Sequence, residues 1–434
     1  MNLTPKLIIY FLIIAFLSMF LEDARFLFLI QSPVKVTVMD FLYLLVFLYF
    51  LRANFETTFF QELLSSKIYL IYLVFILIAL VYGISQWDFI IALGGLKIFA
   101  PMFAISLPVF IVGKTRLNDT EYIARLFRAT VVVSAIGSLV LFIIEIFYGG
   151  RFFFTRTLSY DLGLDRMEDF RGIRYLGSQE TFNILLLALL LIYRSVAIRK
   201  IKGLEIFPAL GLIIVSLITK NRTAILSLTG IFLIQTLLTQ RRFLLFLISV
   251  SIILSFAVIE FINPKITKAI MEPYTKALNV GSDVTGSWRL YSNLAYLREG
   301  LNTPVLGKGL TSHYAGGVYV KELKEKITFP PHNMFVIQFF QSGIVATLLL
   351  LIFTVILTAE IYKLNKYLQN NQALLQSNYL LLTIVSSQIV YGQFYGYIWF
   401  FGLYCGFSML MIQSVYRNAL PGPSLDGPIE ISRL

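Results

Sequence analysis

Long apolar stretches separated by short polar segments dominate this chain. A helix needs about 20 mostly apolar residues to cross the hydrocarbon core of a membrane, and about twelve stretches approach that length. They are residues 7–21, 36–51, 68–85, 97–112, 130–148, 181–196, 204–219, 223–239, 243–262, 333–358, 379–395 and 399–416. The pattern predicts an all-α, polytopic membrane protein in which residues 1–434 form a single transmembrane domain.

Composition supports this interpretation. Of the 434 residues, 58% are hydrophobic and 14% charged, whereas soluble domains carry about 25% charged residues. There is too little charge to cover a solvated surface, so the sequence excludes an ordinary soluble enzyme and a disordered chain. The single cysteine, Cys405, excludes an intramolecular disulfide.

Lys and Arg residues predict the orientation, because cytoplasmic loops are enriched in them. With the N-terminus in the cytoplasm, the short cytoplasmic loops hold fourteen Lys and Arg residues and the short loops on the other side hold five. Both termini are then cytoplasmic. The net charge of +12 reflects this bias together with contacts to anionic membrane lipids, and it gives no support for nucleic-acid binding.

Two long polar segments fall on the extracytoplasmic side. Residues 149–180 carry five arginines and five acids, and residues 263–331 carry nine basic and five acidic residues. Functional side chains concentrate on such loops. In the second loop, between the ninth and tenth spans, we expect an amphipathic helix near 286–300, capped by Thr285 or Ser287 and ended by Gly300.

The loop 263–331 ends in Pro330-Pro331-His332-Asn333, directly before an apolar run. Two prolines favour an extended approach, and Asn333 is a plausible N-cap of the next helix. His332 is therefore expected at the outer membrane boundary, at the positive end of a helix.

Several motifs together resemble the O-antigen ligase and O-antigen polymerase superfamily. They are S-W-R-L-Y, P-V-L-G-K-G-L, P-H-N-M-F and Q-S-G-I-V-A, preceded by I-T-K-N-R-T-A-I-L-S-L and F-R-G-I-R-Y-L-G-S. The resemblance covers roughly residues 170–350. It rests on the order and spacing of these motifs and on their predicted side of the membrane.

The resemblance implies a GT-C-like glycosyltransferase that needs neither metal nor cofactor and inverts the anomeric centre. Its donor would be an undecaprenyl-diphosphate-linked oligosaccharide. The acceptor would be a second lipid-linked glycan in a polymerase, which we favour, or lipid A–core in a ligase. A chain-length regulator is a possible further partner.

Carried over residue by residue, the resemblance assigns catalytic roles to Arg222, Arg289 and His332. Arginine presents a planar fork that binds phosphate oxygens in bidentate fashion, so two arginines can stabilise a diphosphate leaving group. Neutral histidine suits the general base that activates the acceptor hydroxyl. Weaker candidates for binding the diphosphate or the glycan are Arg171, Arg174, Lys220, Arg298 and Asn333.

Simpler roles stay open for the same residues. Lys220 and Arg222 could be interface anchors, Arg289 a charge facing lipid headgroups, and His332 only a residue at a helix start. Arg171 and Arg174 could form ion pairs with neighbouring acids.

A different function class is transport, by a lipid-linked oligosaccharide flippase or a secondary transporter. That class predicts two similar halves and charges in mid-span, whereas this chain is asymmetric and its largest loop follows the ninth span. A non-catalytic scaffold would leave the two arginines and the histidine unexplained.

Overall fold

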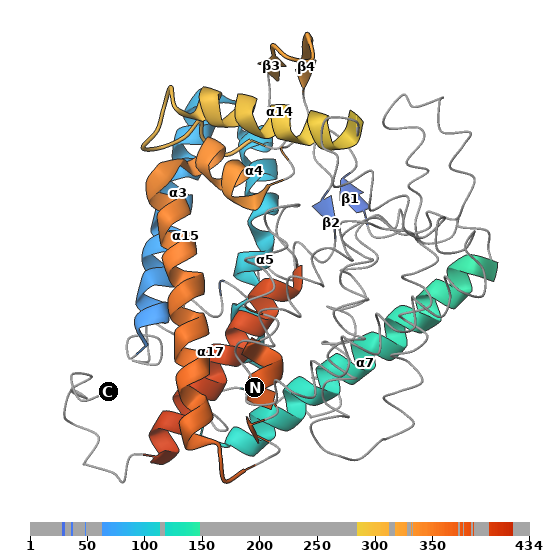
Figure 1. Ribbon diagram of the computed structural model, residues 1–434, viewed down its shortest axis with the longest axis vertical. Coiled ribbons are helices and arrows are strands. Elements are labelled where there is room, and N and C mark those ends of the chain that lie inside the picture. Colours follow the sequence, from blue (N-terminus) through green and yellow to red (C-terminus); the bar gives the residue numbers. More distant parts are fainter. Residues whose placement is uncertain are drawn as a thin grey trace, which may run out of the picture.

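The computed structural model is mostly helical (Figure 1). It describes residues 28–30, 36–37, 48, 63–112, 118–147, 284–311, 317–327, 331, 333–371, 374–375, 377–382, 385 and 399–419. The predicted spans 7–21, 181–196, 204–219, 223–239 and 243–262 lie outside these residues, as does the loop 149–180.

Two of the described helices are long and apolar enough to cross a membrane, namely α3 (Leu64–Gln86) and the segment Met334–Leu368 that contains α15 (Met334–Tyr367). They match the predicted spans 68–85 and 333–358. The two helices pack along one another (Figure 1), and the rings of Tyr69 and Phe353 meet between them at 5.6 Å.

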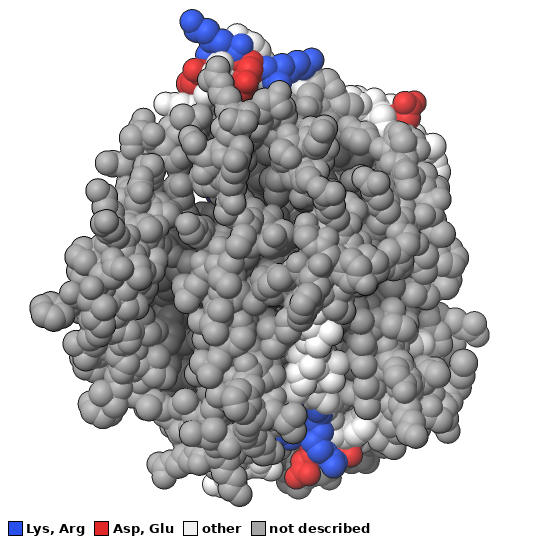
Figure 2. Space-filling model, turned by 90° about the vertical axis from the view of Figure 1, so that its right-hand side faces the viewer, with Lys and Arg blue, Asp and Glu red and all other residues white. Residues whose placement is uncertain are grey.

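Charged side chains of the described helices lie near the helix ends. α15 has no charged residue before Glu360, and α3 has none after Lys67. Figure 2 shows described charged residues at the top and near the bottom of the visible face. This distribution is the one expected of helices whose middle parts face hydrocarbon.

The prediction of one continuous helix over 97–112 is wrong. The chain forms three short helices there, α4 (Phe89–Ile98), α5 (Ala100–Phe103) and α6 (Ser106–Val112). Proline cannot donate a backbone hydrogen bond, and Pro101 and Pro108 lie in this segment. A side chain at Gly406 would clash with the carbonyl oxygen of Ile105, so the break at 104–105 lies directly against α17 (Trp399–Ala419).

α17 is the most enclosed of the described helices. Every residue from Phe401 to Val415 is buried, including Ser408 and Gln413. A helix that is apolar on all sides belongs in the interior. Its bounds agree with the predicted span 399–416, with three further residues at its C-terminal end.

α7 (Thr120–Phe147) begins ten residues before the predicted span 130–148. The side chain of Asp119 accepts a hydrogen bond from the amide of Tyr122 at 2.8 Å, which caps the helix start. The first turns carry Glu121, Arg125 and Arg128, so they form a polar extension below the apolar part.

The predicted span 36–51 does not begin as a helix. Val36 and Thr37 form strand β2 (Val36–Thr37), which pairs antiparallel with β1 (Phe28–Ile30). These residues are β-branched and favour strands, and hydropathy alone does not distinguish a short strand from a helix start.

A helix and a hairpin cover one end of the α3–α15 pair (Figure 1). They are α14 (Val284–Gly300) and the antiparallel strands β3 (Val318–Val320) and β4 (Glu325–Ile327). α14 ends at Gly300 as predicted. The predicted caps are wrong, because Thr285 and Ser287 lie inside the helix.

Candidate functional site

The site is built on α14, whose residues divide between two faces. Trp288, Tyr291, Ala295 and Arg298 recur at helical spacing and face the hairpin β3–β4. Arg289, Ser292, Asn293, Tyr296 and Gly300 form a second stripe, because residues three, four and seven apart share a face.

The hairpin side of α14 is held by polar and apolar contacts. Trp288 Nε1 donates to Glu325 Oε1 at 3.2 Å, and Arg298 Nη1 pairs with Glu322 Oε1 at 3.0 Å. Val318 and Val320 pack against the apolar residues between these polar contacts. The hairpin therefore fixes the rotation of α14 about its own axis.

The pKa of Glu322 lies below its ordinary value. A backbone hydrogen bond at Glu322 itself contributes most, and the hydrogen bond from Arg298 adds to it. The carboxylate is thus stabilised in its charged form, although it is exposed.

The C-terminal half of the second stripe packs on α15. The rings of Tyr296 and Phe340 meet edge to face at 4.9 Å, and a side chain at Gly300 would collide with the ring of Phe339. Burial raises the pKa of Tyr296 well above its ordinary value, so its hydroxyl stays protonated and donates to the carbonyl oxygen of Ile327.

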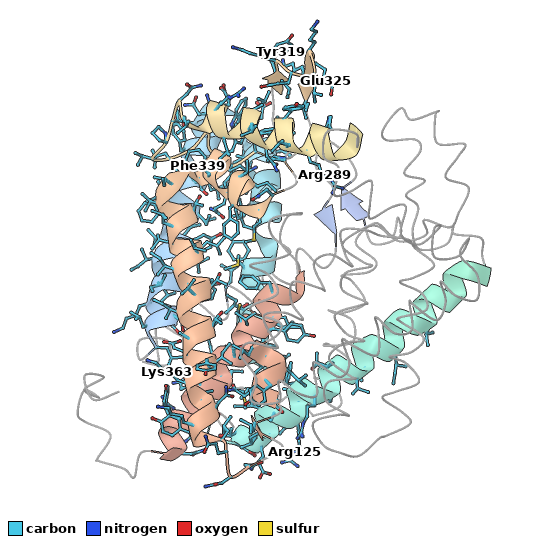
Figure 3. All side chains as sticks on the ribbon, viewed as in Figure 1. Arg125, Arg289, Tyr319, Glu325, Phe339 and Lys363 are labelled. Atoms are coloured by element: carbon cyan, nitrogen blue, oxygen red, sulfur yellow. The ribbon has the colours of Figure 1, made fainter. Side chains whose placement is uncertain are left out.

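The N-terminal half of the stripe carries the polar groups. Figure 3 shows Arg289 on the side of α14 that faces away from Tyr319 and Glu325 of the hairpin. Arg289 is half-buried, and Ser292, one turn further, is completely buried. Figure 1 shows this end of α14 extending past α15.

A loop holds α14 in place by inserting into α15. In a continuous helix, the amide of Ile344 would donate to the carbonyl oxygen of Phe340. Here Ile344 N donates to Pro304 O and Phe340 O accepts from Lys308 N, each at 2.8 Å. The loop thus separates two turns of α15 and replaces the lost hydrogen bond with two of its own.

Glycines make this insertion possible. Gly343, at the break in α15, has φ +78°, and an added Cβ would collide with the carbonyl of Val305. Gly309 has φ +82°, and an added Cβ would lie 2.6 Å from the Cα of Gly83 on α3. Only glycine combines positive φ with so close an approach.

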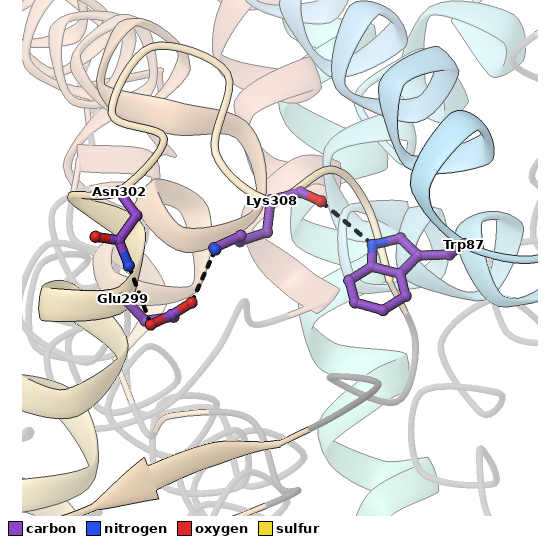
Figure 4. Close-up of polar contacts among 4 residues, drawn as sticks. All are labelled: Trp87, Glu299, Asn302 and Lys308. Atoms are coloured by element: carbon purple, nitrogen blue, oxygen red, sulfur yellow. Dashed lines mark hydrogen bonds and ion pairs between the residues drawn. The ribbon is translucent and has the colours of Figure 1, made fainter.

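Side-chain contacts secure the same loop from outside (Figure 4). Lys308 Nζ pairs with Glu299 Oε1 at 2.8 Å, and Asn302 donates to the other oxygen of Glu299 at 3.2 Å. Trp87 Nε1 donates to the Lys308 carbonyl at 3.2 Å. These contacts join the end of α14 to the end of α3.

Asn333 is the N-cap of α15, as predicted. Its side-chain oxygen accepts from the amides of Phe335 at 2.9 Å and Val336 at 3.2 Å. Val336 packs in one apolar cluster with Tyr296, so the positive end of α15 meets α14. The side-chain oxygen of Asn333 is therefore engaged in capping α15.

The structure places three of the predicted site residues. Arg289 lies on the second stripe of α14, and Asn333 caps the neighbouring α15. Arg298 lies on the hairpin face, and its observed partner is Glu322. The remaining predicted residues, Arg171, Arg174, Lys220, Arg222 and His332, lie outside the described residues.

Two polar residues next to Arg289 were not predicted. Ser292 Oγ and Asn293 Oδ1 are both shielded from solvent, and neither has a hydrogen-bond partner among the described residues. The sequence feature that could have identified them is their spacing of three and four residues from Arg289, which places all three residues on one helix face.

A half-buried guanidinium at the end of apolar helices is suited to a phosphate. It binds phosphate oxygens through two parallel hydrogen bonds, and partial burial strengthens the attraction relative to water.

One comparison shows which family this region is similar to. Residues 207–351 match a family model described as O-antigen ligase. The match includes all of α14, the inserted loop, the hairpin and the first half of α15. No curated protein matches the chain. This match supports the resemblance to the O-antigen ligase and polymerase superfamily over residues 207–351 of a mostly helical chain.

Proposed function

We propose that this protein is a glycosyltransferase that moves a glycan en bloc from undecaprenyl diphosphate to a sugar hydroxyl of an acceptor. The position of Arg289 is the observation that carries the proposal. Arg289 is half-buried on the side of α14 that faces away from Tyr319 and Glu325 of the hairpin (Figure 3), inside the region that matches the ligase family. A diphosphate attached to a membrane lipid is held at this depth, where apolar helices meet a polar cover.

The reaction breaks the bond between the anomeric carbon and the diphosphate oxygen and forms a bond to the acceptor oxygen. Arg289 and Arg222 would stabilise the negative charge that grows on the departing diphosphate. His332 would take the acceptor's proton. Attack from the face opposite the leaving group inverts the anomeric centre, and this mechanism requires no metal.

The arrangement of the chain in the membrane is part of the same proposal. The chain would cross the bacterial inner membrane about twelve times in a GT-C-like fold, with both termini in the cytoplasm. The end that carries α14 and the hairpin would face the periplasm.

A transfer assay with purified protein and lipid-linked donor tests the role of arginine. Arg289→Ala and Arg222→Ala should each lower the rate by roughly 10²-fold or more, because each removes charge stabilisation in the transition state. Arg289→Lys should also be impaired, because lysine lacks the planar fork. Arg125→Ala is the matched control, since Arg125 is exposed at the opposite end of the molecule. Full activity of Arg289→Ala would refute the proposal at that position.

We favour the polymerase reaction, in which the acceptor is a second lipid-linked repeat unit. The ligase reaction is the second candidate, because the matched family is described as O-antigen ligase. Supplying the donor lipid alone distinguishes the two reactions. A polymerase should give longer glycans still bound to diphosphate, whereas a ligase should give product only when lipid A–core is added.

A further inference from the structure

Two buried polar atoms beside Arg289 have no role in holding the described structure together. Ser292 is completely buried, and its Oγ has no hydrogen-bond partner among the described residues. The Oδ1 atom of Asn293 is also buried, and it also has no hydrogen-bond partner among the described residues. Both residues follow Arg289 by one turn of α14, which is about 5 Å along the helix axis.

Such atoms are costly to the folded protein. A buried donor or acceptor without a partner loses its hydrogen bonds to water, which destabilises the fold. Thr303 Oγ1 and Gln341 Oε1 are likewise buried without a partner among the described residues, whereas two other neighbouring polar side chains have partners. The side-chain oxygen of Asn333 accepts two hydrogen bonds, and Tyr296 donates to Ile327. Buried orphan atoms on a helix face that also carries an arginine therefore indicate a binding site for a polar ligand.

The type of atom limits what the ligand is. Asn293 Oδ1 only accepts hydrogen bonds, and an ionised diphosphate also offers only acceptors. The diphosphate therefore cannot satisfy the Oδ1 atom of Asn293, although it can satisfy Arg289. A sugar hydroxyl can donate to Asn293 and can also exchange a hydrogen bond with the hydroxyl of Ser292.

We propose that Ser292 and Asn293 form a subsite for the sugar that is attached directly to the diphosphate, and that they bind its hydroxyl groups. This inference rests on the proposed function, since it takes Arg289 as the diphosphate ligand. The spacing of one helical turn between Arg289 and these two residues suits such a subsite, because a sugar ring attached to the phosphate lies about one turn's length from it. Sites that hydrogen-bond a hydroxyl discriminate strongly against ligands that lack it, so these two residues would select the first sugar.

Two lipids distinguish contacts to the sugar from contacts to the phosphate. The probes are undecaprenyl diphosphate bearing the glycan and undecaprenyl diphosphate without sugar, each titrated against purified protein in lipid nanodiscs. Asn293→Ala and Ser292→Ala should each weaken binding of the glycan-bearing lipid by about 3- to 10-fold, the range for one neutral hydrogen bond. Binding of the sugar-free lipid should stay unchanged. Arg289→Ala should weaken binding of both lipids.

Asn302→Ala is the matched control for Asn293→Ala. It removes the same amide nine residues later, where Asn302 is exposed and bonded to Glu299. It should leave the affinity for both lipids unchanged.

Thermal unfolding without ligand gives an independent measurement. Ser292→Ala removes an unsatisfied buried hydroxyl, so its unfolding midpoint should be equal to or higher than that of the unmodified protein. Weaker glycan binding together with undiminished stability indicates a ligand-binding role, since a structural role would lower both.

Three results would overturn the inference. Equal weakening for both lipids would make Ser292 and Asn293 phosphate ligands, and unchanged affinity in both variants would leave them without a ligand. A lower unfolding midpoint of Ser292→Ala would assign its hydroxyl to the fold. None of these results would affect the proposed function, which fails instead if the unmodified protein binds and transfers no lipid-linked glycan.

Discussion

Pro331 and Asn333 flank His332 in the sequence, and the structure describes both of them. Pro331 is buried, and Asn333 is committed to capping α15 through two hydrogen bonds. His332 itself lies outside the described residues, and its role as the general base stays a prediction.

The two histidines provide a matched pair for testing the general base. His332→Ala should lower the transfer rate by roughly 10²-fold or more, because a positioned base contributes about 10²- to 10⁴-fold. His313→Ala should cost little, since it removes the same group from the same loop without the flanking Pro331 and Asn333. Single-turnover transfer by the purified protein is the measurement. Equal, mild losses in both variants would leave the base unassigned.

Sequence reasoning identified residues whose structural role depends only on their neighbours in the chain. The N-cap Asn333 and the helix end at Gly300 were predicted correctly, because capping is a local property. The partner of Arg298 was not predicted, since Glu322 lies 24 residues away in a hairpin that the sequence did not indicate. Ser292 and Asn293 were missed because burial without a partner is a tertiary property.

At the scale of elements, the fit between α14, the inserted loop and the broken α15 decides where Arg289 points. The loop satisfies both backbone groups freed by the break and also binds α3, where Leu310 N donates to Ala79 O at 3.1 Å. The sequence motif containing Gly307 and Gly309 was part of the family resemblance. Its physical role, the insertion into α15, could not be predicted because it depends on the kink at Gly343.

Gly343→Ala should strongly destabilise the protein. The new Cβ would collide with the carbonyl of Val305 and would force a residue with a side chain to adopt φ +78°. We expect a loss of about 3 kcal/mol or more in the free energy of unfolding, read as a lower midpoint in thermal or denaturant unfolding. Leu348→Ala, an exposed change one turn later on the same helix, should have a much smaller effect. Equal effects of the two changes would refute the role of the insertion.

The ion pair between α14 and the hairpin predicts a dependence of stability on pH. The pKa of Glu322 is lowered in the folded protein, first by a backbone hydrogen bond and then by Arg298. Its contribution is therefore complete above the pKa of the unfolded chain, about 4.3, and is lost as the pH falls through the lower folded value. Below about pH 4 the midpoint of the unmodified protein should approach that of Glu322→Gln. A constant difference between the two proteins down to pH 3 would contradict this assignment.

At the scale of the whole molecule, the sequence predicted the membrane class better than the course of each span. α3, α15 and α17 lie where hydropathy placed them, because about 20 apolar residues are enough to define a membrane helix. The segment 97–112 has the same hydropathy but breaks into short helices that pack against α17. Hydropathy reports the apolar character of a segment, whereas the break depends on prolines and on the close approach of Gly406.

The two ends of the molecule separate the loops as the predicted topology requires. The starts of α3 and α7 and the end of α15 lie at one end, and Asn418 at the end of α17 donates to the Asn118 carbonyl at 2.8 Å. α14 and the hairpin lie at the other end (Figure 1). In the predicted orientation the first end faces the cytoplasm and the second faces the periplasm.

Single-cysteine labelling tests that orientation. Lys324, between β3 and β4, and Lys363, near the end of α15, are both exposed. Figure 3 shows Lys363 at the end of the molecule opposite to Tyr319 and Glu325 of the hairpin. The native Cys405 is buried and should react slowly. An impermeant maleimide added to intact spheroplasts should label Lys324→Cys at once and Lys363→Cys only after permeabilisation, and cysteines within 197–203 should behave like Lys363→Cys. The reverse pattern would place Arg289 on the cytoplasmic side, and the protein could then not use a donor presented at the periplasmic face.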